Sequence, residues 1–286
     1  MLIGIDLGSR FVKIALGQPP LPAGSIHFRE DPEGSTPKER GLWPLIEYRI
    51  FETIRFYQEY CRPGKNGFVI NFKDLGLEAD QVVACGYGRQ AAAISGAVAI
   101  PEIQAHALAV RISHDCRDFL LIDLGGQDSK IILVKNGEVA DFSTNDKCAA
   151  GSGRYLENAA RTLDLSLAEF GNYWQNPEPL SSTCAVFGES ELIGKIITGI
   201  PLENLAAGAN LSVVLRILPL ISRYSPTPHI YFSGGVAANA AIHKLLEENL
   251  GQKVIVLPDP QYNGARGCFF KAWQIRGQKS EDRGRR

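Results

Sequence analysis

The sequence opens with LIGIDLGSRFVK (residues 2–13), and FLLIDLGGQDSK (residues 119–130) repeats its pattern further along the chain. Each copy has an apolar strand with an aspartate near its end, a turn that contains glycine, and a second apolar strand. A pattern that returns in the same order indicates an internal duplication. We therefore expect an α/β protein with two related halves, each of which begins with a β-hairpin.

Hydrophobic periodicity and breakers predict the rest of the chain in outline. Proline and glycine interrupt regular structure at 17–44, and the polar end from Arg276 predicts a frayed tail. We expect a first half at 1–115, a second half at 116–270 and a C-terminal tail at 271–286. The expected helices are 45–60, 90–98, 102–112, 153–163, 189–200, 205–223 and 237–249, and the expected strands are 82–84, 229–233 and 254–257.

Composition restricts the class of protein and its partners. The chain has 286 residues, of which 45% are hydrophobic, so it has enough apolar residues for one large core or two moderate ones. Lys and Arg number 30 and Asp and Glu 31, which gives no overall field that would favour nucleic acid or an anionic membrane. Neither a leader nor an apolar stretch of membrane-spanning length is evident, so we expect a cytoplasmic protein.

The two hairpin turns predict a site for a magnesium-bound phosphate. Asp6 and Asp123 each lie beside a glycine turn, where the exposed backbone N–H groups can reach phosphate oxygens. One such turn is more often a plain hairpin, but two at equivalent places favour the nucleotide interpretation. The other candidates are Gly8, Gly125 and Gly126, for close approach of the backbone, and Lys13 and Lys130, for a point charge.

A third glycine element follows the expected strand at 229–233. It reads SGGVAAN (residues 233–239) and precedes an expected helix. The bare backbone of Gly234 and Gly235 can pack against a purine or a ribose. We include Asn239 among the candidate nucleotide-binding residues.

Two of the six cysteines, Cys148 and Cys184, each precede an expected helix. A helix N-terminus favours the thiolate, and thiolates bind zinc or an iron–sulfur cluster. One chain offers only two such ligands, so a symmetric dimer would complete a set of four. Spacing alone favours two buried thiols, by roughly three to one, and the residues that flank the cysteines reverse this preference. The remaining cysteines, at 61, 85, 116 and 268, are expected to be structural.

A series of motifs resembles the 2-hydroxyacyl-CoA dehydratase activator family, a BadF/BadG/BcrA/BcrD-type ATPase family within the actin, hexokinase and chaperone ATPase superfamily. The resemblance implies a fold of duplicated ribonuclease-H-like domains around a nucleotide cleft. It covers the first strand pair and about 86–270. The motifs are GYGR (86–89), EIQAHA (102–107), DLGGQDSK (123–130), NDKCAAGSGRYLE (145–157), SSTCAVFGESELI (181–193), FSGGVAAN (232–239) and PQYNGARG (260–267).

The family resemblance implies an ATP-dependent one-electron donor that acts in anaerobic metabolism. It implies a homodimer with one four-iron, four-sulfur cluster, ligated by Cys148 and Cys184 of each subunit. It also implies that ATP or ADP binds with Mg²⁺ and that hydrolysis uses Asp6 and Asp123, with Gln127 as a residue that orients water and Ser9 in the first phosphate turn. Ferredoxin or flavodoxin would supply the electron, and a dehydratase or another double-cluster reductase would receive it.

Two departures from the family pattern keep other functions open. Arg10, Phe11 and Val12 replace the small hydroxyl residues expected after the first Gly-Ser, and residues 17–80 show little resemblance to the family. A cluster-free sugar or metabolite kinase would share the phosphate motifs but would have no use for the cysteine pair. A nucleotide-dependent scaffold without hydrolysis is the second alternative.

Overall fold

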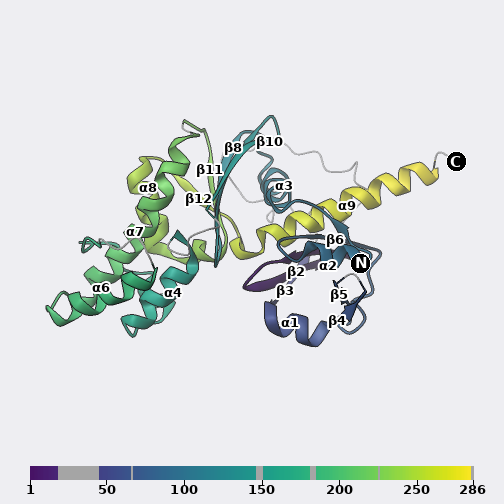
Figure 1. Cartoon of the computed structure of the whole chain (residues 1–286). Helices are drawn as coiled ribbons and strands as arrows, with labels where there is room; N and C mark the ends of the chain where they lie inside the picture. Colours follow the sequence, from purple (N-terminus) through teal and green to yellow (C-terminus); the bar gives the residue numbers. More distant parts are fainter. Residues whose placement is uncertain (19–44, 66, 146–150, 181–184, 225, 285–286) are drawn as a thin grey trace. The chain divides into compact units, whose positions relative to one another are not determined.

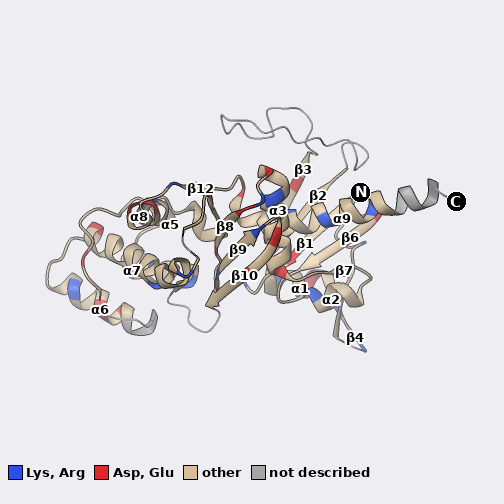
Figure 2. Cartoon of the chain, turned by 90° about the horizontal axis from the view of Figure 1, so that it is seen from above, with Lys and Arg blue, Asp and Glu red and all other residues tan. Residues whose placement is uncertain are grey.

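The computed structural model describes residues 1–18, 45–65, 67–145, 151–180, 185–224 and 226–284. The chain divides into two compact units (Figure 1). The first unit combines Met1–Arg117 with Tyr262–Arg286, and the second is Asp118–Gln261. Acidic and basic residues are both spread through the two units (Figure 2).

The first unit is built on a five-stranded sheet with the order β3-β2-β1-β6-β7. The central strand β1 pairs antiparallel with β2 and parallel with β6. The strands are β1 (Leu2–Leu7), β2 (Phe11–Gly17), β3 (Ile46–Glu52), β6 (Gln81–Cys85) and β7 (Val98–Ala99), with a separate hairpin of β4 (Cys61–Gly64) and β5 (Gly67–Ile70). The helices are α1 (Thr53–Tyr60), α2 (Arg89–Ile94), α3 (Glu102–His114) and α9 (Asn263–Gly284).

The second unit repeats this arrangement with the order β10-β9-β8-β11-β12. Its central strand β8 also pairs antiparallel with the next strand and parallel with the fourth, which confirms the predicted duplication. The strands are β8 (Phe119–Leu124), β9 (Ser129–Lys135), β10 (Glu138–Asn145), β11 (Ile230–Ser233) and β12 (Val254–Val256). The helices are α4 (Gly153–Thr162), α5 (Leu167–Phe170), α6 (Ala185–Ile197), α7 (Leu202–Ser222) and α8 (Ala240–Leu250), with 3₁₀ turns at Gly235–Ala238 and Pro260–Tyr262.

Both faces of β1 are buried, as its nearly continuous apolar sequence requires. Ile3 and Ile5 face one apolar cluster, and Leu2 faces another that includes residues of α9. Gly4 lies on the α9 side, where a β-carbon would come within 2.2 Å of the Ala265 carbonyl oxygen. A glycine is therefore needed for α9 to lie directly on the strand.

The packing of α9 corrects the prediction for the C-terminus. The predicted second half ran to residue 270 and was followed by a frayed tail, whereas the helix runs from Asn263 to Gly284 and belongs to the first unit. Phe269, Phe270 and Trp273 are buried against the first sheet and α3. Burial of these side chains holds the helix in place, although its sequence is polar after Arg276.

The segment 45–60 is the second correction, because the predicted single helix is a strand followed by a helix. Residues 46–52 form the edge strand β3, which pairs with β2 along its length. Leu45 and Ile54, two apolar residues of this segment, are exposed. The predicted helix at 90–98 likewise ends at Ile94, before strand β7.

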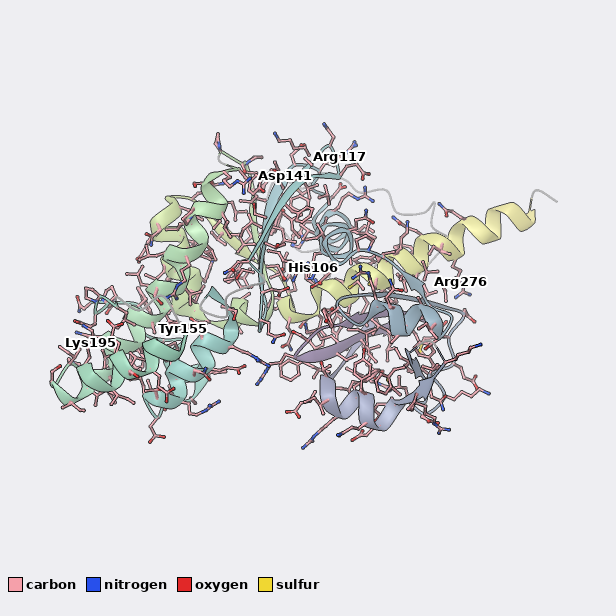
Figure 3. The ribbon with its side chains drawn as sticks, viewed as in Figure 1. His106, Arg117, Asp141, Tyr155, Lys195 and Arg276 are labelled. Atoms are coloured by element: carbon pink, nitrogen blue, oxygen red, sulfur yellow. The ribbon has the colours of Figure 1, made fainter. Side chains whose placement is uncertain are left out.

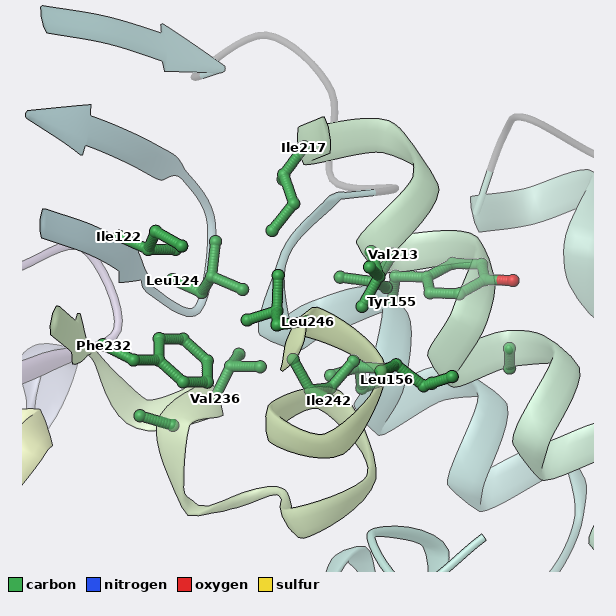
Figure 4. Packing of buried hydrophobic residues seen from close by; sticks show 14 of the residues in the cluster. Ile122, Leu124, Tyr155, Leu156, Val213, Ile217, Phe232, Val236, Ile242 and Leu246 are labelled. Atoms are coloured by element: carbon green, nitrogen blue, oxygen red, sulfur yellow. The ribbon is translucent and has the colours of Figure 1, made fainter. Parts of the chain in front are cut away.

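The core of the second unit gathers around β8, α4, α7 and α8 (Figure 4). Within the described residues α7 is long and apolar enough to cross a membrane by length and composition, so the expectation that no stretch reaches that length was wrong. Most of the helix is buried in this core, where residues such as Val213 and Ile217 are fully covered. Burial on several sides explains why its sequence is apolar nearly all round.

His114, the last residue of α3, should make the stability of the folded protein depend on pH. Burial and the nearby Arg266 charge lower the pKa of His114 from 6.5 to about 4. Between these values the unfolded chain binds a proton that the folded chain does not, so stability rises with pH up to about 6.5. The folded protein should lose up to about 3 kcal/mol between pH 7 and pH 4 through this histidine. Urea unfolding at several pH values should show a flatter dependence in His114→Gln, and equal slopes in the two proteins would contradict the prediction.

Candidate functional site

Asp6 is a buried carboxylate near the end of β1, and its two oxygens have different partners. The Lys13 ammonium group lies 3.1 Å from Asp6 Oδ2. The Cys85 thiol donates to Asp6 Oδ1 across 3.9 Å. Only 3% of Asp6 is exposed, so its negative charge is stabilised mainly by these neighbours and by the lysine above all.

Asp123 has the same setting in the second unit. The Ser233 hydroxyl donates to Asp123 Oδ1 at 2.7 Å, and Lys130 Nζ lies 3.8 Å from Oδ2. Lys130 Nζ is closer to Asp128, at 2.7 Å. The lysine therefore lies between two carboxylates, one at the strand end and one in the turn.

The strand registers show that the two settings are equivalent. Asp6 is opposite Lys13 on one side and Cys85 on the other, and Asp123 is opposite Lys130 and Ser233 in the same way. Sequence reasoning had identified both aspartates and both lysines but missed Cys85 and Ser233. The signal lay in the residue before each glycine, in CGYG (85–88) and SGG (233–235).

The two glycines that follow these partners also match. Gly86 and Gly234 have φ angles of 87° and 90°, which favour glycine. A β-carbon on Gly86 would approach the Leu7 carbonyl oxygen to 2.7 Å, and one on Gly234 would approach the Leu124 carbonyl oxygen to 2.2 Å. In each half, the backbone of this glycine therefore lies close to the carbonyl group of the residue that follows the aspartate, at the end of the central strand.

The second turn that is predicted to bind phosphate, residues 125–128, is closed by a backbone hydrogen bond. Gly125 N–H donates to the Asp128 carbonyl oxygen at 2.9 Å, while Gly126 and Gln127 are partly exposed. A β-carbon on Gly125 would lie 2.9 Å from the Asp128 carboxylate and 3.3 Å from the Asp128 carbonyl oxygen. Gln127 therefore lies in the predicted turn, and its role in orienting water stays a prediction.

The first turn that is predicted to bind phosphate, residues 8–10, differs from the second in its side chains. The Gly8 carbonyl oxygen accepts from the Thr53 hydroxyl at 2.8 Å, and Ser9 is exposed. The Arg10 guanidinium lies 5.3 Å from the centre of the Phe11 ring. Arg10 thus lies in this turn, and Phe11 is the first residue of β2.

The glycine element at 233–239 joins β11 to α8. Asn239 accepts from Ile242 N–H through Oδ1 at 3.0 Å and donates to Asn210 Oδ1 through Nδ2 at 3.0 Å. Its amide therefore caps α8 and ties it to α7. This explains the asparagine structurally, and its predicted contact with nucleotide stays untested.

His106 is a core histidine with partners. It is buried in α3 (Figure 3), and Asn263 Nδ2 lies 3.1 Å from His106 Nδ1 and 3.2 Å from the His106 carbonyl oxygen. The carbonyl can only accept, so the amide nitrogen of Asn263 faces it and donates to Nδ1 as well. The proton of the neutral ring is then on Nε2.

The four cysteines in the described part of the chain are free thiols. A hydrogen bond with the Cys268 side chain, together with burial, raises the pKa of Cys85 well above its ordinary value. Burial raises the pKa of Cys61 to about 11. Both are therefore protonated at neutral pH, and no group of three His, Cys, Asp or Glu side chains within the described residues can hold a metal ion.

Cys148 and Cys184, the predicted cluster ligands, lie outside the described residues. The helices that follow them are described. α6 begins at Ala185, directly after Cys184, and α4 begins at Gly153, after the described residues Gly151 and Ser152. A thiolate directly before the 13-residue helix α6 would be favoured by the helix dipole.

Comparison with known proteins identifies the family. A family model described as the BadF/BadG/BcrA/BcrD ATPase family matches residues 69–271, which is most of the chain. The chain belongs to this family. The two sheets and the structural match below confirm the predicted duplicated ribonuclease-H-like fold of the actin-like ATPases.

Relatives with different descriptions resemble the chain. The (R)-2-hydroxyglutaryl-CoA dehydratase activating ATPase of Acidaminococcus fermentans is 37% identical over 67% of this chain and 75% of its own length. An uncharacterized Methanocaldococcus jannaschii protein, MJ0004, is also 37% identical, over 64% and 74%. The activator of the 2-hydroxyisocaproyl-CoA dehydratase from Clostridium difficile, solved with bound ADPNP, has a TM-score of 0.77 at 27% identity, with 99% of this chain and 97% of that chain covered. Family membership therefore leaves the specific activity open.

Proposed function

We propose that this protein is an ATP-dependent one-electron donor that activates a 2-hydroxyacyl-CoA dehydratase or a related double-cluster reductase. The observation that carries the proposal is the pair of equivalent Asp–Lys settings, found in a chain of the BadF/BadG/BcrA/BcrD ATPase family. The names of relatives such as the activator of lactoyl-CoA dehydratase of Anaerotignum propionicum, 37% identical over 73% of this chain, support the activating role.

The described residues suit magnesium and phosphate chemistry. Mg²⁺ prefers oxygen ligands, and the carboxylates of Asp6 and Asp123 would bind it directly or through its bound waters. Lys13 and Lys130 offset these buried charges and provide positive charge near a phosphate. Hydrolysis would consume water and ATP and release ADP and phosphate, with Gln127 orienting the water.

Cys148 and Cys184 are the residues that we assign to the cluster. Burial raises the pKa of Cys61, and a hydrogen bond with Cys268 together with burial raises the pKa of Cys85, which disfavours the thiolate that a metal needs at these two positions. Two cysteines from each of two chains would hold one four-iron, four-sulfur cluster, and we therefore propose a homodimer. Such a cluster, when bound, stores the single electron that ferredoxin or flavodoxin would supply.

The test is iron and acid-labile sulfide after anaerobic purification from the cytoplasm of an expression host. We expect four iron and four sulfide per two chains in the wild type, as one shared four-iron cluster requires. Cys148→Ala and Cys184→Ala should each lose the iron, because each substitution removes one ligand from both chains and only two of the four ligands remain at the shared site. Cys116→Ala, which alters a described free thiol, is the matched control.

Iron-free wild type after reconstitution would overturn the proposal. A kinase or a scaffold of the same fold would then be the better hypothesis for the function. Phosphate release with and without a reduced partner enzyme separates a scaffold from an ATPase, because a scaffold would not hydrolyse ATP. Loss of iron in Cys116→Ala would contradict the assignment of the ligands.

A further inference from the structure

The motifs EIQAHA (102–107) and PQYNGARG (260–267) have no role in the proposed function above, yet the first unit brings them together. His106 of the first motif lies in α3 (Figure 3), and Asn263 of the second is the first residue of α9. Asn263 donates through Nδ2 to His106 Nδ1 at 3.1 Å and to the His106 carbonyl oxygen at 3.2 Å. Both side chains are buried, so the two motifs form one hydrogen-bonded group inside the protein.

The Asn263 amide fixes which nitrogen of the His106 ring carries the proton. Because Nδ1 accepts from Asn263, the neutral ring has its proton on Nε2. The Glu102 carboxylate, one turn earlier in α3, lies 3.8 Å from Nε2 and favours the proton there. Within the described residues Asn263 Oδ1 is buried without a hydrogen-bond partner, which is unfavourable. An apolar side chain would avoid that cost, so the hold on the ring explains the asparagine.

His106 Nε2 and the buried carboxylate of Asp6 both lie against Gly264, the second residue of α9. A β-carbon on Gly264 would be 3.0 Å from His106 Nε2 and 3.2 Å from Asp6 Oδ2. The two atoms are therefore close enough to interact, directly or through one water molecule. Any larger residue at position 264 would crowd both groups, which explains a glycine at the start of this helix.

The two oxygens of Asp6 face different surroundings. Oδ2 is 3.1 Å from Lys13 Nζ and lies on the side of His106 Nε2. Oδ1 lies toward the glycine turn at the end of β6, since a β-carbon on Gly86 would approach it to 2.7 Å. Groups that hold Oδ2 therefore set the direction of Oδ1, as hydrogen bonds behind a metal-binding carboxylate commonly do.

We propose that His106 is a positioning residue for Asp6, whose Oδ2 it holds through the Nε2–H group. The inference rests on the proposed function, because that function assigns Asp6 to the magnesium of the bound nucleotide. Asn263 fixes the tautomer of the ring, and Glu102 favours the proton on the nitrogen beside Asp6. The role differs from that of Lys13, because a neutral imidazole donates a hydrogen bond without neutralising the carboxylate.

Two amide variants separate hydrogen bonding from packing, because each reproduces one nitrogen of the ring. His106→Gln places an N–H donor near the position of Nε2, and His106→Asn places an acceptor near that of Nδ1. Calorimetry measures the affinity for ADP with Mg²⁺ and with EDTA in its place. His106→Asn should lose about 10-fold or more of the gain in affinity that Mg²⁺ gives the wild type, the usual effect when the support of a metal ligand is removed. His106→Gln should keep this gain within about 3-fold, because its donor remains.

The affinity in EDTA identifies damage to the fold, because a displaced α3 would weaken binding under both conditions. His243→Asn is the matched control. His243 also has a glutamate one turn away, Glu247 at 3.6 Å, but its Nε2 lies 2.8 Å from the Val254 carbonyl oxygen in the second unit. This variant should respond to Mg²⁺ as the wild type does. Equal losses in His106→Asn and His106→Gln, or a wild-type response in His106→Asn, would overturn the inference.

The wild type alone tests the tautomer. Nitrogen-15 NMR of the imidazole rings, with His106 assigned through the backbone of α3, should show its proton on Nε2, and Mg²⁺–ADP should shift this signal. A proton on Nδ1, or an unshifted signal at saturating Mg²⁺–ADP, would overturn the inference even if both His106 variants fail to fold. A wild type that binds ADP equally well with and without Mg²⁺ would do the same. Failure of the proposed electron transfer looks different, because iron would be absent while the magnesium response and its loss in His106→Asn remain.

Discussion

Asp123→Asn should reduce the rate of phosphate release from ATP by about 1000-fold, the order seen when one preorganised charge-stabilising group is removed. The substitution keeps the size of the side chain, and its amide oxygen can still accept from the Ser233 hydroxyl. It removes the negative charge that would hold Mg²⁺ or its water. Lys130 retains Asp128 as a partner at 2.7 Å, so the lysine is not left buried without a counter-charge.

Two measurements separate this chemical effect from a change in folding. The free energy of urea unfolding should change by less than about 1 kcal/mol, since hydrogen bonding and volume are preserved. Asp118→Asn is the control, because Asp118 precedes the same strand at its other end and bonds to Asn136 N–H at 3.0 Å. If Asp123→Asn releases phosphate at a tenth of the wild-type rate or faster, Asp123 does not have the proposed role.

The hairpins were predictable because each combines strong local signals with a repeat. The run 2–13 and its copy at 119–130 have apolar strands with buried faces and glycine turns, and the structure places both as predicted. The equivalence of Cys85 and Ser233 was not predictable in the same way. The equivalence depends on the register between β1 and β6 and between β8 and β11, and the strands of each pair are far apart in the chain. The two equivalent residues also differ in type, since one is a cysteine and the other a serine.

The errors also have physical causes. Residues 46–52 carry apolar side chains at spacings that fit either a helix or a strand, and pairing with β2 decides in favour of the strand. The part of α9 from residue 271 onward was predicted as a tail because its last residues are polar. The deciding feature is long-range burial of Phe269, Phe270 and Trp273, which local sequence cannot reveal.

The same substitution should destabilise the protein strongly at Gly234 and leave its stability nearly unchanged at the adjacent Gly235. In Gly234→Ala the new methyl group would lie 2.2 Å from the Leu124 carbonyl oxygen, and the residue would have to keep a φ of 90°. Both atoms that collide are held by the central strands of the second sheet, since β8 and β11 pair directly. We expect a loss of more than about 4 kcal/mol in the free energy of unfolding, in the range that marks a severe backbone clash.

Gly235→Ala should leave the fold intact, because its β-carbon would have no atom within 4 Å and its φ is not positive. Its free energy of unfolding should stay within about 0.5 kcal/mol of the wild type. If the bare backbone at this position contacts adenosine as the sequence predicts, this stable variant should bind ADP more weakly.

Urea unfolding and calorimetric titration with Mg²⁺–ADP check both glycines. A folded Gly234→Ala of wild-type stability would mean that the β11 turn relaxes, and unchanged ADP binding in Gly235→Ala would remove that glycine from the nucleotide site.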